Sequence, residues 1–405
     1  MKKLAVLFGS RTVEHDVSIV TGLQLLENVD KTKYDAYPVY ISRKGEWFVG
    51  DPLKDVSFYK NFSPEAKGIT KVYLPPIPGY DGLYAKASGG LLKKTDAKVM
   101  HMDCAILAMH GMHGEDGTLQ GLFEMADIPY SSAGVTGAAV GMDKIVMKAV
   151  FSSMGLPVLQ SQYYYRKQFK EHPEQVMDGI EAAFSYPLII KPANLGSSIG
   201  IGIAHDRRDL KNKLDVAAHY DRRILAEKCI TDLTEINCAC VGYGDDCMAS
   251  LCEQPVKDEG REGPLSFDEK YLRGGKTAGS KTQGKGMASL SRIIPAPISE
   301  EMTEKIQTMT KDVFRMLECK GVVRIDYMID NSDGNVYINE INTIPGSFAY
   351  YLFEPMGVTY MQLIDKLVEG AYAARKEKLD SEFAYNSDIL SSVVLNGAKG
   401  SGTKR

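Results

Sequence analysis

Apolar residues in the first part of the chain form strand-like runs separated by a helix-like stripe. KKLAVLFG (2–9) is an apolar run that ends at a glycine, which predicts a buried strand. VSIVTGLQLLENV (17–29) has apolar residues at helical spacing, and AYPVYISRKGEWFV (36–49) predicts two strands around a turn. CAILAMHG (104–111) predicts an apolar strand that leads into a polar loop. We therefore expect an N-terminal parallel α/β domain over residues 1–131, with functional loops at its strand ends.

The next stretch predicts a second, smaller α/β domain over residues 132–227. DKIVMKAVFSSMGLPV (143–158) predicts a helix that Gly155 closes. YPLIIKPANLGSSIGIGIA (186–204) predicts a strand, a glycine-rich turn and another strand. RRILAEKCI (222–230) predicts one more strand beside them.

The last part of the chain predicts a long helix followed by a hairpin. SEEMTEKIQTMTKDVFRMLECKG (299–321) carries an apolar stripe, with Ser299 as its N-cap and Gly321 as its end. GVVRIDYMID (321–330) and VYINEIN (336–342) both read as strands, and the polar residues between them predict a turn.

These elements define a third domain, which we place at residues 228–380. A final helix is expected at 360–375. The irregular stretch rich in glycine, lysine, serine and threonine predicts a mobile loop at 271–292. Residues 381–405 are expected to form a disordered tail.

Composition narrows the class of protein. A length of 405 residues suggests two or three domains, and 44% hydrophobic residues can form a real core. The formal net charge of −4 and the lack of a long basic block argue against a nucleic-acid partner. No run approaches the ~18 apolar residues of a membrane span, so a cytoplasmic protein is expected. Seven cysteines without C-x-x-C spacing indicate buried free thiols rather than a zinc site.

The hairpin carries polar residues at alternating positions. Arg324 and Asp326 are two apart on the first strand, and Glu340 and Asn342 are two apart on the second. Because side chains alternate between the faces of a strand, each pair shares one face, and pairing of the strands would bring both pairs together. Their oxygens suit Mg²⁺, and a guanidinium can stabilise developing negative charge. The alternative is an ordinary solvated sheet face with surface ion pairs.

A second candidate site is the glycine-rich turn after Lys191. Its backbone N–H groups, two serines and the lysine could together hold phosphate groups. The turn is not a P-loop, and GSKTQGKG (279–286) is rejected because a glycine follows its last lysine. HGMHGEDGTLQG (110–121) lacks the H-E-x-x-H spacing of a zinc site, so it predicts a loop that shapes a pocket.

Several segments together resemble one family, the D-alanine–D-alanine ligases of the ATP-grasp superfamily. They occur in the family's order and extend to about residue 375. The segments are GSRTVEHDVS (9–18), HGMHGEDGTLQG (110–121), IPYSSAGVTGAAVGMDKIVMK (128–148), KPANLGSSIGI (191–201), EKY (269–271), GVVRIDY (321–327) and NEINTIPG (339–346). The resemblance implies a three-domain ATP-grasp architecture, with ATP held between the central and C-terminal domains.

The resemblance also implies roles for the hairpin residues. Asp326, Glu340 and Asn342 are expected to bind two Mg²⁺ ions, for which Mn²⁺ is a possible substitute. Arg324 and the backbone N–H of Gly346 are expected to stabilise a tetrahedral intermediate.

Other residues are expected, by the same resemblance, to bind ATP. Together they would hold the phosphates, the adenine and the ribose of ATP. These residues are Lys144, Lys191, Ser198, Glu227, Lys228, Ile230, Glu235 and Lys270.

The first amino-acid substrate is expected to be bound near the N-terminal loops. Glu14, Ser197 and Tyr271 match a hydrogen-bonded triad, in which Glu14 holds the substrate's ammonium and Tyr271 belongs to the closing loop. His110 matches a residue beside that substrate's carboxylate.

The sequence departs from the family pattern after the hairpin. In SFAYYLFEP (347–355), Tyr351 takes the place of a serine that binds the carboxylate of the second substrate, and Leu352 follows it. Ser347 and Tyr350 offer nearby hydroxyls that could substitute. In the first loop, Ser10 and Thr12 replace a usual glycine and serine.

Three hypotheses follow. The first is a ligase that uses Mg²⁺ and ATP to join two D-alanine molecules for peptidoglycan synthesis, as a cytoplasmic homodimer. The second keeps this mechanism but changes the acceptor to D-serine, D-lactate or another amino acid. The third is a nucleotide-binding protein that has lost catalysis.

Overall fold

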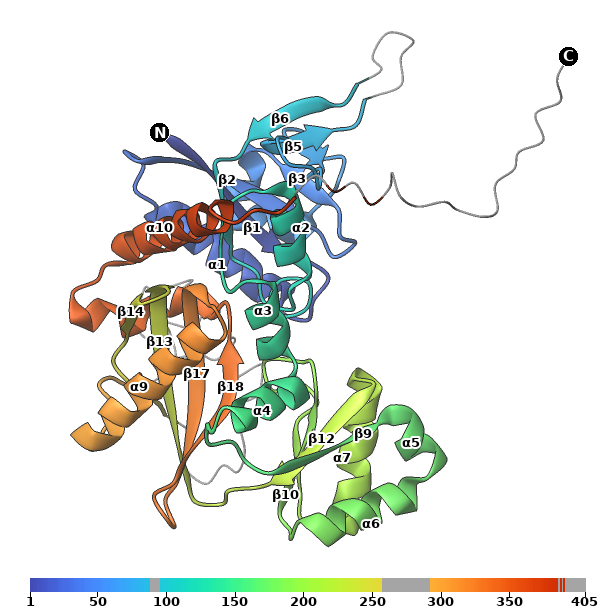
Figure 1. Ribbon diagram of the computed structural model, residues 1–405. Coiled ribbons are helices and arrows are strands. Elements are labelled where there is room, and N and C mark those ends of the chain that lie inside the picture. The colour runs from blue at the N-terminus through green and yellow to red at the C-terminus, as the bar shows by residue number, and fades with distance from the viewer. Residues whose placement is uncertain (88–94, 257–291, 385–386, 388, 390–405) are drawn as a thin grey trace, which may run out of the picture.

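Residues 1–87, 95–256, 292–384, 387 and 389 are described by the computed structural model of this chain (Figure 1). The predicted loop at 271–292, apart from Arg292, and most of the predicted tail lie outside these described residues, as do Lys270 and Tyr271.

The N-terminal unit is built on a six-stranded sheet in the order β4-β3-β2-β1-β7-β8. β1 pairs in parallel with β2 and β7, and β7 with β8, which confirms the predicted parallel sheet. β3 and β4 extend one edge in antiparallel fashion. The strands are β1 (Lys2–Gly9), β2 (Tyr34–Ile41), β3 (Trp47–Val49), β4 (Thr70–Val72), β7 (Cys104–Leu107) and β8 (Tyr130–Ser131).

Helices and a small hairpin complete this unit (Figure 1). β5 and β6 pair with each other as a separate antiparallel hairpin. The remaining elements are α1 (His15–Asn28), η1 (Asp51–Lys54), η2 (Val56–Asn61), β5 (Gly82–Ala85), β6 (Ala97–His101) and α2 (Thr118–Ala126).

Close packing of α1 on β1 gives a first testable prediction. A Cβ atom added at Gly22 would lie 2.3 Å from Phe8 Cδ1, whereas one added at Gly121 of α2 would meet nothing within 4 Å. Gly22→Ala should therefore lower the free energy of unfolding by about 1–3 kcal/mol through overpacking. Gly121→Ala should raise it by up to about 1 kcal/mol, because alanine is the better helix former. Denaturant titration of both variants tests this, and equal effects would contradict it.

The central unit is a four-stranded antiparallel sheet in the order β11-β10-β12-β9, packed against helices. The buried residues of its apolar core lie between Phe169 and Ala226 in the sequence, so α4 (Lys144–Ser153) is not part of this core. β10 and β11 flank the glycine-rich turn as predicted. The elements are β9 (Ser161–Tyr165), α5 (Arg166–Glu171), α6 (Pro173–Ala183), β10 (Leu188–Pro192), β11 (Gly202–Ala204), α7 (Arg207–Tyr220) and β12 (Arg223–Lys228).

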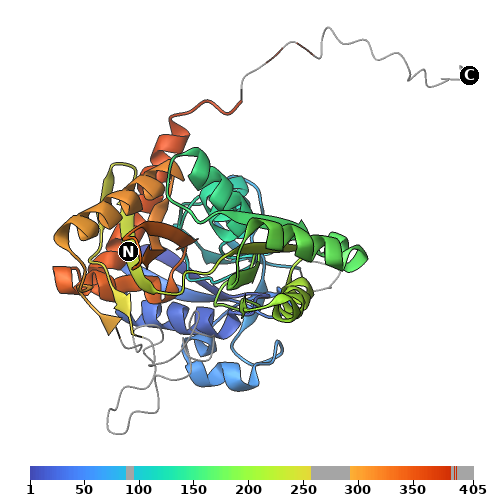
Figure 2. The same ribbon diagram turned by 90° about the horizontal axis from the view of Figure 1, so that it is seen from below.

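The C-terminal unit is a four-stranded antiparallel sheet in the order β14-β13-β17-β18. Seen from below, this unit and the central unit lie on opposite sides of the molecule (Figure 2). The elements are β13 (Leu233–Tyr243), β14 (Asp246–Ala249), β15 (Gln254–Pro255), β16 (Arg292–Ile293), α9 (Glu300–Met316), β17 (Lys320–Asp330), β18 (Val336–Asn342), η5 (Gly346–Leu352), η6 (Glu354–Met356) and α10 (Tyr360–Leu379).

α3 (Val135–Met142) and α4 connect the N-terminal unit to the other two. Met147 and Phe151 of α4 lie in the core of the C-terminal unit. Sequence segments that we grouped with the central domain therefore pack on the C-terminal sheet. The domain boundaries at 131/132 and 227/228 stay predictions.

The helix before the hairpin ends earlier than predicted. Ser299 caps α9 by accepting a hydrogen bond from the Met302 N–H, as expected. The helix stops at Met316, and Glu318 adopts a φ of 48°. Gly321, which we had taken as the end of the helix, instead lies inside β17 with a φ of 77°. That prediction was wrong because a glycine with positive φ can equally bend a strand.

Six of the seven cysteines are buried, as predicted, and Cys247 is half-buried. All seven cysteines are free thiols, and Cys238 and Cys240 lie in the apolar core of the C-terminal unit. Among the described residues, no helix is both long and apolar enough to cross a membrane.

Candidate functional site

The hairpin of β17 and β18 brings the predicted polar residues together. In the antiparallel register Arg324 faces Asn342 and Asp326 faces Glu340. A bulge follows directly, between Asp326 and Tyr327. The alternation of side chains therefore places four polar groups on one face, as the sequence predicted.

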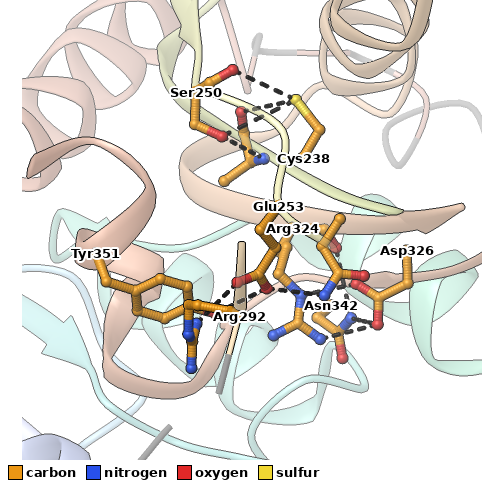
Figure 3. Close-up of polar contacts among 10 residues, drawn as sticks. Cys238, Ser250, Glu253, Arg292, Arg324, Asp326, Asn342 and Tyr351 are labelled. Atoms are coloured by element: carbon orange, nitrogen blue, oxygen red, sulfur yellow. Dashed lines mark hydrogen bonds and ion pairs between the residues drawn. The ribbon is translucent and has the colours of Figure 1, made fainter. Parts of the chain in front are cut away.

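Arg324 and Asp326 form a two-bond pair at the centre of this face (Figure 3). The Arg324 Nε and NH2 groups donate to the two Asp326 oxygens at 2.7 and 2.8 Å. Asn342 Nδ2 donates to Asp326 Oδ2 at 3.2 Å. Burial alone would lower the pKa of Arg324, but the Asp326 carboxylate outweighs it and raises that pKa well above its usual value. Arg324 is thus a fixed cation beside oxygen donors.

Lys144 links the hairpin to the glycine-rich turn. Its Nζ donates to the Leu195 carbonyl at 2.7 Å and lies 3.5 Å from Glu340 Oε2. Asp143 precedes it as the N-cap of α4 and accepts from two backbone N–H groups of the first turn. The start of α4 therefore holds an ammonium between the predicted phosphate turn and a predicted metal ligand.

Lys191 at the end of β10 belongs to a buried charge triad. Its Nζ pairs with Glu227 and also donates to Asn339 Oδ1 at 3.0 Å. Glu227 is fully buried, and its second oxygen lies 2.9 Å from Lys148 Nζ. Burial would raise the pKa of Glu227, but Lys191 and Lys148 outweigh it and lower that pKa to about 2. Burial lowers the pKa of Lys148, against the opposing effect of Glu227.

Sequence reasoning missed Lys148, although a signal was present. It lies one helical turn after Lys144 on α4, so both lysines share a helix face. The Glu227 carboxylate binds the two lysines in this structure, and its role in ATP binding stays a prediction.

The other predicted nucleotide residues lie at the end of β12 and just after it, on β13, and in the glycine-rich turn. Lys228 is exposed at the end of β12, Ile230 is buried two residues on, and Glu235 lies on β13. Ser198 is half-buried in the glycine-rich turn, where it and Ser197 adopt φ values of 58° and 53°. Such left-handed backbone is uncommon outside glycine and is found at ligand-binding turns.

The N-terminal loop reaches the same turn. Glu14 Oε1 accepts a hydrogen bond from Ser197 Oγ, which brings together two members of the predicted triad. A Cβ atom at Gly196 would lie 3.1 Å from Glu14 Oε2, so the turn approaches Glu14 closely. A pocket of about 400 Å³ opens here, lined by Glu14, Gly111 and Gly196 among others. The third predicted member, Tyr271, lies outside the described residues.

His110 lies between the N-terminal unit and the loop after the hairpin. Its Nδ1 lies 2.9 Å from the Ile344 carbonyl, which can only accept, so Nδ1 carries the hydrogen. Its Nε2 lies 2.8 Å from Thr21 Oγ1. Burial lowers the pKa of His110 to about 4, so the ring is neutral at pH 7. Its predicted place beside a substrate carboxylate stays a prediction.

Glu115 makes a second contact between the N-terminal unit and the loop after the hairpin, and the sequence did not reveal it. Its two oxygens accept from the Gly111 and Ile344 N–H groups at 2.9 and 2.8 Å. Although the side chain keeps some exposure, desolvation first and the Glu14 carboxylate next raise the pKa of Glu115 to about 8. This residue and His110 fix the loop that leads from Asn342 to Gly346.

The segment after the hairpin has an unusual backbone. Gly346 begins η5, and Ser347, Phe348 and Ala349 all have φ values near 50°. Each left-handed residue of this kind costs about 1–2 kcal/mol. Ser347 Oγ donates to Gln24 Oε1 of α1 at 2.8 Å, so this hydroxyl joins the two units. Tyr351 and Leu352 are both buried at the end of the segment.

Comparison with known proteins identifies the family of this chain. Family models described as the D-ala D-ala ligase N-terminus and C-terminus match residues 3–133 and 150–369. The chain belongs to the D-alanine–D-alanine ligase family. The D-alanine–D-alanine ligase of Thermosipho melanesiensis is 36% identical, over 93% of this chain and 96% of that protein. The corresponding protein of Acetivibrio thermocellus is 35% identical, over 93% and 98%.

Solved structures of family members share the fold. The VanG D-Ala:D-Ser ligase from Enterococcus faecalis has a TM-score of 0.73 and 26% identity, covering 91% of this chain and 99% of that one. The D-alanine-D-alanine ligase from Coxiella burnetii has a TM-score of 0.72 and 24% identity, covering 94% and 98%. The predicted α/β ATP-grasp fold is therefore confirmed.

Proposed function

We propose that this chain joins two D-alanine molecules in an ATP-dependent reaction that releases ADP and phosphate. The product, D-alanyl-D-alanine, would serve peptidoglycan synthesis. The observation that carries the proposal is the convergence of two cation–carboxylate groups on one site. The Arg324–Asp326 pair lies on the hairpin, and Lys144 joins Glu340 to the glycine-rich turn.

The site suits the first half of the reaction. A carboxylate oxygen of the first D-alanine attacks the γ-phosphorus of ATP, ADP leaves, and D-alanyl phosphate forms. Both reactants are anions, so cations must offset their repulsion. Lys144 and Lys191 are the residues we assign to the phosphates, with Ser198 beside them and Lys270 outside the described residues.

Asp326, Glu340 and Asn342 fit a magnesium site by their chemistry. They present two carboxylates and one amide oxygen on a single sheet face, and Mg²⁺ prefers such oxygen ligands together with water and phosphate. When bound, the metal would supply positive charge to the phosphate oxygens. We propose two Mg²⁺ ions here, with Mn²⁺ as a possible substitute.

The second half of the reaction needs an oxyanion site. The amine of the second D-alanine attacks the acyl carbon, and phosphate leaves after a tetrahedral intermediate. Arg324 and the Gly346 N–H are the groups we assign to the oxygen of that intermediate. Glu14 would hold the ammonium of the first substrate, with Ser197 and Tyr271 completing the triad.

The test is phosphate release from ATP with Mg²⁺ and D-alanine, with products identified by mass. We expect D-alanyl-D-alanine as the product, with ADP released in an amount equal to the dipeptide formed. ATP binding without turnover, whatever amino acid is supplied, would instead favour the hypothesis of an inactive nucleotide-binding homologue.

One observation favours a second candidate function. Tyr351 occupies the place where the family pattern has a serine for the acceptor, and a D-Ala:D-Ser ligase is among the similar structures. The second candidate keeps the mechanism and uses D-serine, D-lactate or another amino acid as the acceptor. Adding each compound to the same assay separates the two, because only a mixed product would support the change.

We further propose a cytoplasmic homodimer with ATP and D-alanine as its small-molecule partners. Sedimentation analysis of the purified chain tests the dimer.

A further inference from the structure

The Gly346 N–H, which we assign to the oxyanion, lies outside the sheet that carries the other catalytic groups. β18 ends at Asn342, which is paired with Arg324 of β17. Residues 343–345 belong to no helix or strand, and Gly346 begins η5. The hydrogen bonds among the described residues leave the Gly346 N–H unused. The direction of this N–H therefore depends on what holds residues 343–347.

Two side chains of the N-terminal unit hold both backbone groups of Ile344. The Ile344 N–H donates to Glu115 Oε1 at 2.8 Å, and the Ile344 carbonyl accepts from His110 Nδ1 at 2.9 Å. The Ile344 side chain is 2% exposed and lies in the apolar core that includes the N-terminal sheet. Ile344 is thus clamped two residues before Gly346.

Glu115 is itself held in place by its own loop. Its Oε2 accepts from the Gly111 N–H, and its backbone N–H donates to the Gly111 carbonyl, both at 2.9 Å. Gly111 has a φ of 72°, and a Cβ atom there would lie 2.4 Å from Thr12 Oγ1, so this turn requires glycine. The Glu115 carboxyl group is therefore fixed before it reaches Ile344. Whether ionised or protonated, it keeps an oxygen that can accept from the Ile344 N–H.

A second set of hydrogen bonds holds the residue after Gly346. The Ser347 N–H donates to Thr21 Oγ1 of α1 at 3.4 Å, a long hydrogen bond. The Thr21 hydroxyl donates in turn to His110 Nε2 at 2.8 Å, because the hydrogen of the His110 ring is on Nδ1. Gly346 therefore lies between two anchored residues, and both anchors belong to the N-terminal unit.

We propose that Glu115 is a positioning residue of the ligation step, which clamps Ile344 and so aims the Gly346 N–H at the oxygen of the tetrahedral intermediate. The proposal deepens the proposed ligase function and rests on it. Strand pairing alone places Asp326 and Asn342 on β17 and β18. Loss of the clamp should therefore spare formation of the acyl phosphate and slow the attack of the second amine. A misplacement of about 1 Å can lower a rate by about a hundredfold.

Glu115→Ala in the full-length chain tests this proposal by two rates. Dipeptide formation reports the whole reaction. Exchange of labelled oxygen between the bridging and terminal positions of the ATP phosphates, with Mg²⁺ and D-alanine present, reports reversible formation of the acyl phosphate. We expect the kcat for dipeptide to fall about twentyfold or more and the exchange rate to stay within about threefold of the wild type. Equal falls in both rates, or no fall in either, would overturn the proposal.

Glu115→Gln distinguishes positioning from a general loss of structure. Its amide oxygen can still accept from the Ile344 N–H, so the kcat for dipeptide should stay within about fivefold of the wild type. A Glu115→Gln enzyme as slow as Glu115→Ala would contradict the clamp.

Thr21→Val keeps the test decisive if Glu115→Ala folds poorly. It removes the acceptor of the Ser347 N–H, so the ratio of the dipeptide rate to the exchange rate should fall about three- to tenfold. An unchanged ratio would count against the proposal.

Asp116→Asn is the matched control in the same loop. Asp116 accepts from the N–H groups of His113 and Thr118, so these bonds stay within the loop and the first turn of α2. The ratio of the two rates should be unchanged in this variant. A fall like that of Glu115→Ala would mean that any disturbance of the loop slows ligation, and would refute the specific role of Glu115.

The two rates also separate this proposal from the proposed function. A wild-type chain that shows neither oxygen exchange nor dipeptide formation with D-alanine would refute the proposed function itself. An active enzyme in which Glu115→Ala changes both rates alike would refute only the role of Glu115.

Discussion

Replacing Arg324 by alanine is expected to reduce the rate of dipeptide synthesis by about a hundred- to a thousandfold. Arg324 is 6% exposed, and its guanidinium is held by two hydrogen bonds to Asp326, so it offers its charge without reorganising during the reaction. Loss of one such preorganised donor removes about 3–4 kcal/mol of transition-state stabilisation. Binding of Mg²⁺ and ATP should stay within about tenfold of the wild type, because the oxygen donors of the hairpin remain.

The measurement combines steady-state turnover with calorimetric titration of ATP in the presence of Mg²⁺. Arg315→Ala is the control, since Arg315 pairs with the exposed Asp245 on the surface. Near-normal turnover in Arg324→Ala would show that another group stabilises the oxyanion. A loss of ATP binding equal to the loss of turnover would show instead that Arg324 organises the nucleotide site.

The hairpin was predictable because it depends on a local rule. Side chains alternate along a strand, so the spacing of Arg324 and Asp326, and of Glu340 and Asn342, was enough to place them on one face. The parallel N-terminal sheet was predictable for a related reason, because its strands are apolar on both faces.

Contacts between distant segments were beyond sequence reasoning. Glu253 and Arg292 are 39 residues apart, and only the pairing of β15 with β16 makes them neighbours. Glu115 reaches Ile344 across 229 residues. The left-handed run at Ser347–Ala349 contains no glycine, so the usual sign of such a backbone is missing. In each case tertiary packing decides the conformation.

Replacing Glu227 by glutamine is expected to lower the free energy of unfolding by about 3–5 kcal/mol. Glu227 is the counter-charge of two buried ammonium groups, Lys148 and Lys191, and removing one partner of a buried ion pair leaves uncompensated charge. Denaturant titration at neutral pH measures the loss. Glu171→Gln is the control, because its exposed pair with Lys167 should change stability by less than about 0.5 kcal/mol.

The pH dependence of the free energy of unfolding tests the same triad of Glu227, Lys148 and Lys191. The folded chain holds the pKa of Glu227 at about 2, below the ordinary value of 4.5 for an unfolded glutamate. The ionised carboxylate therefore stabilises the fold above pH 4.5 by roughly 3 kcal/mol, and this contribution disappears as the pH falls towards 2. In Glu227→Gln that part of the acid dependence should be missing, so the stabilities of the two proteins should converge at low pH. Parallel stability curves between pH 7 and pH 3 would contradict the charge assignment, because they would mean that Glu227 binds its proton equally in the folded and unfolded chain.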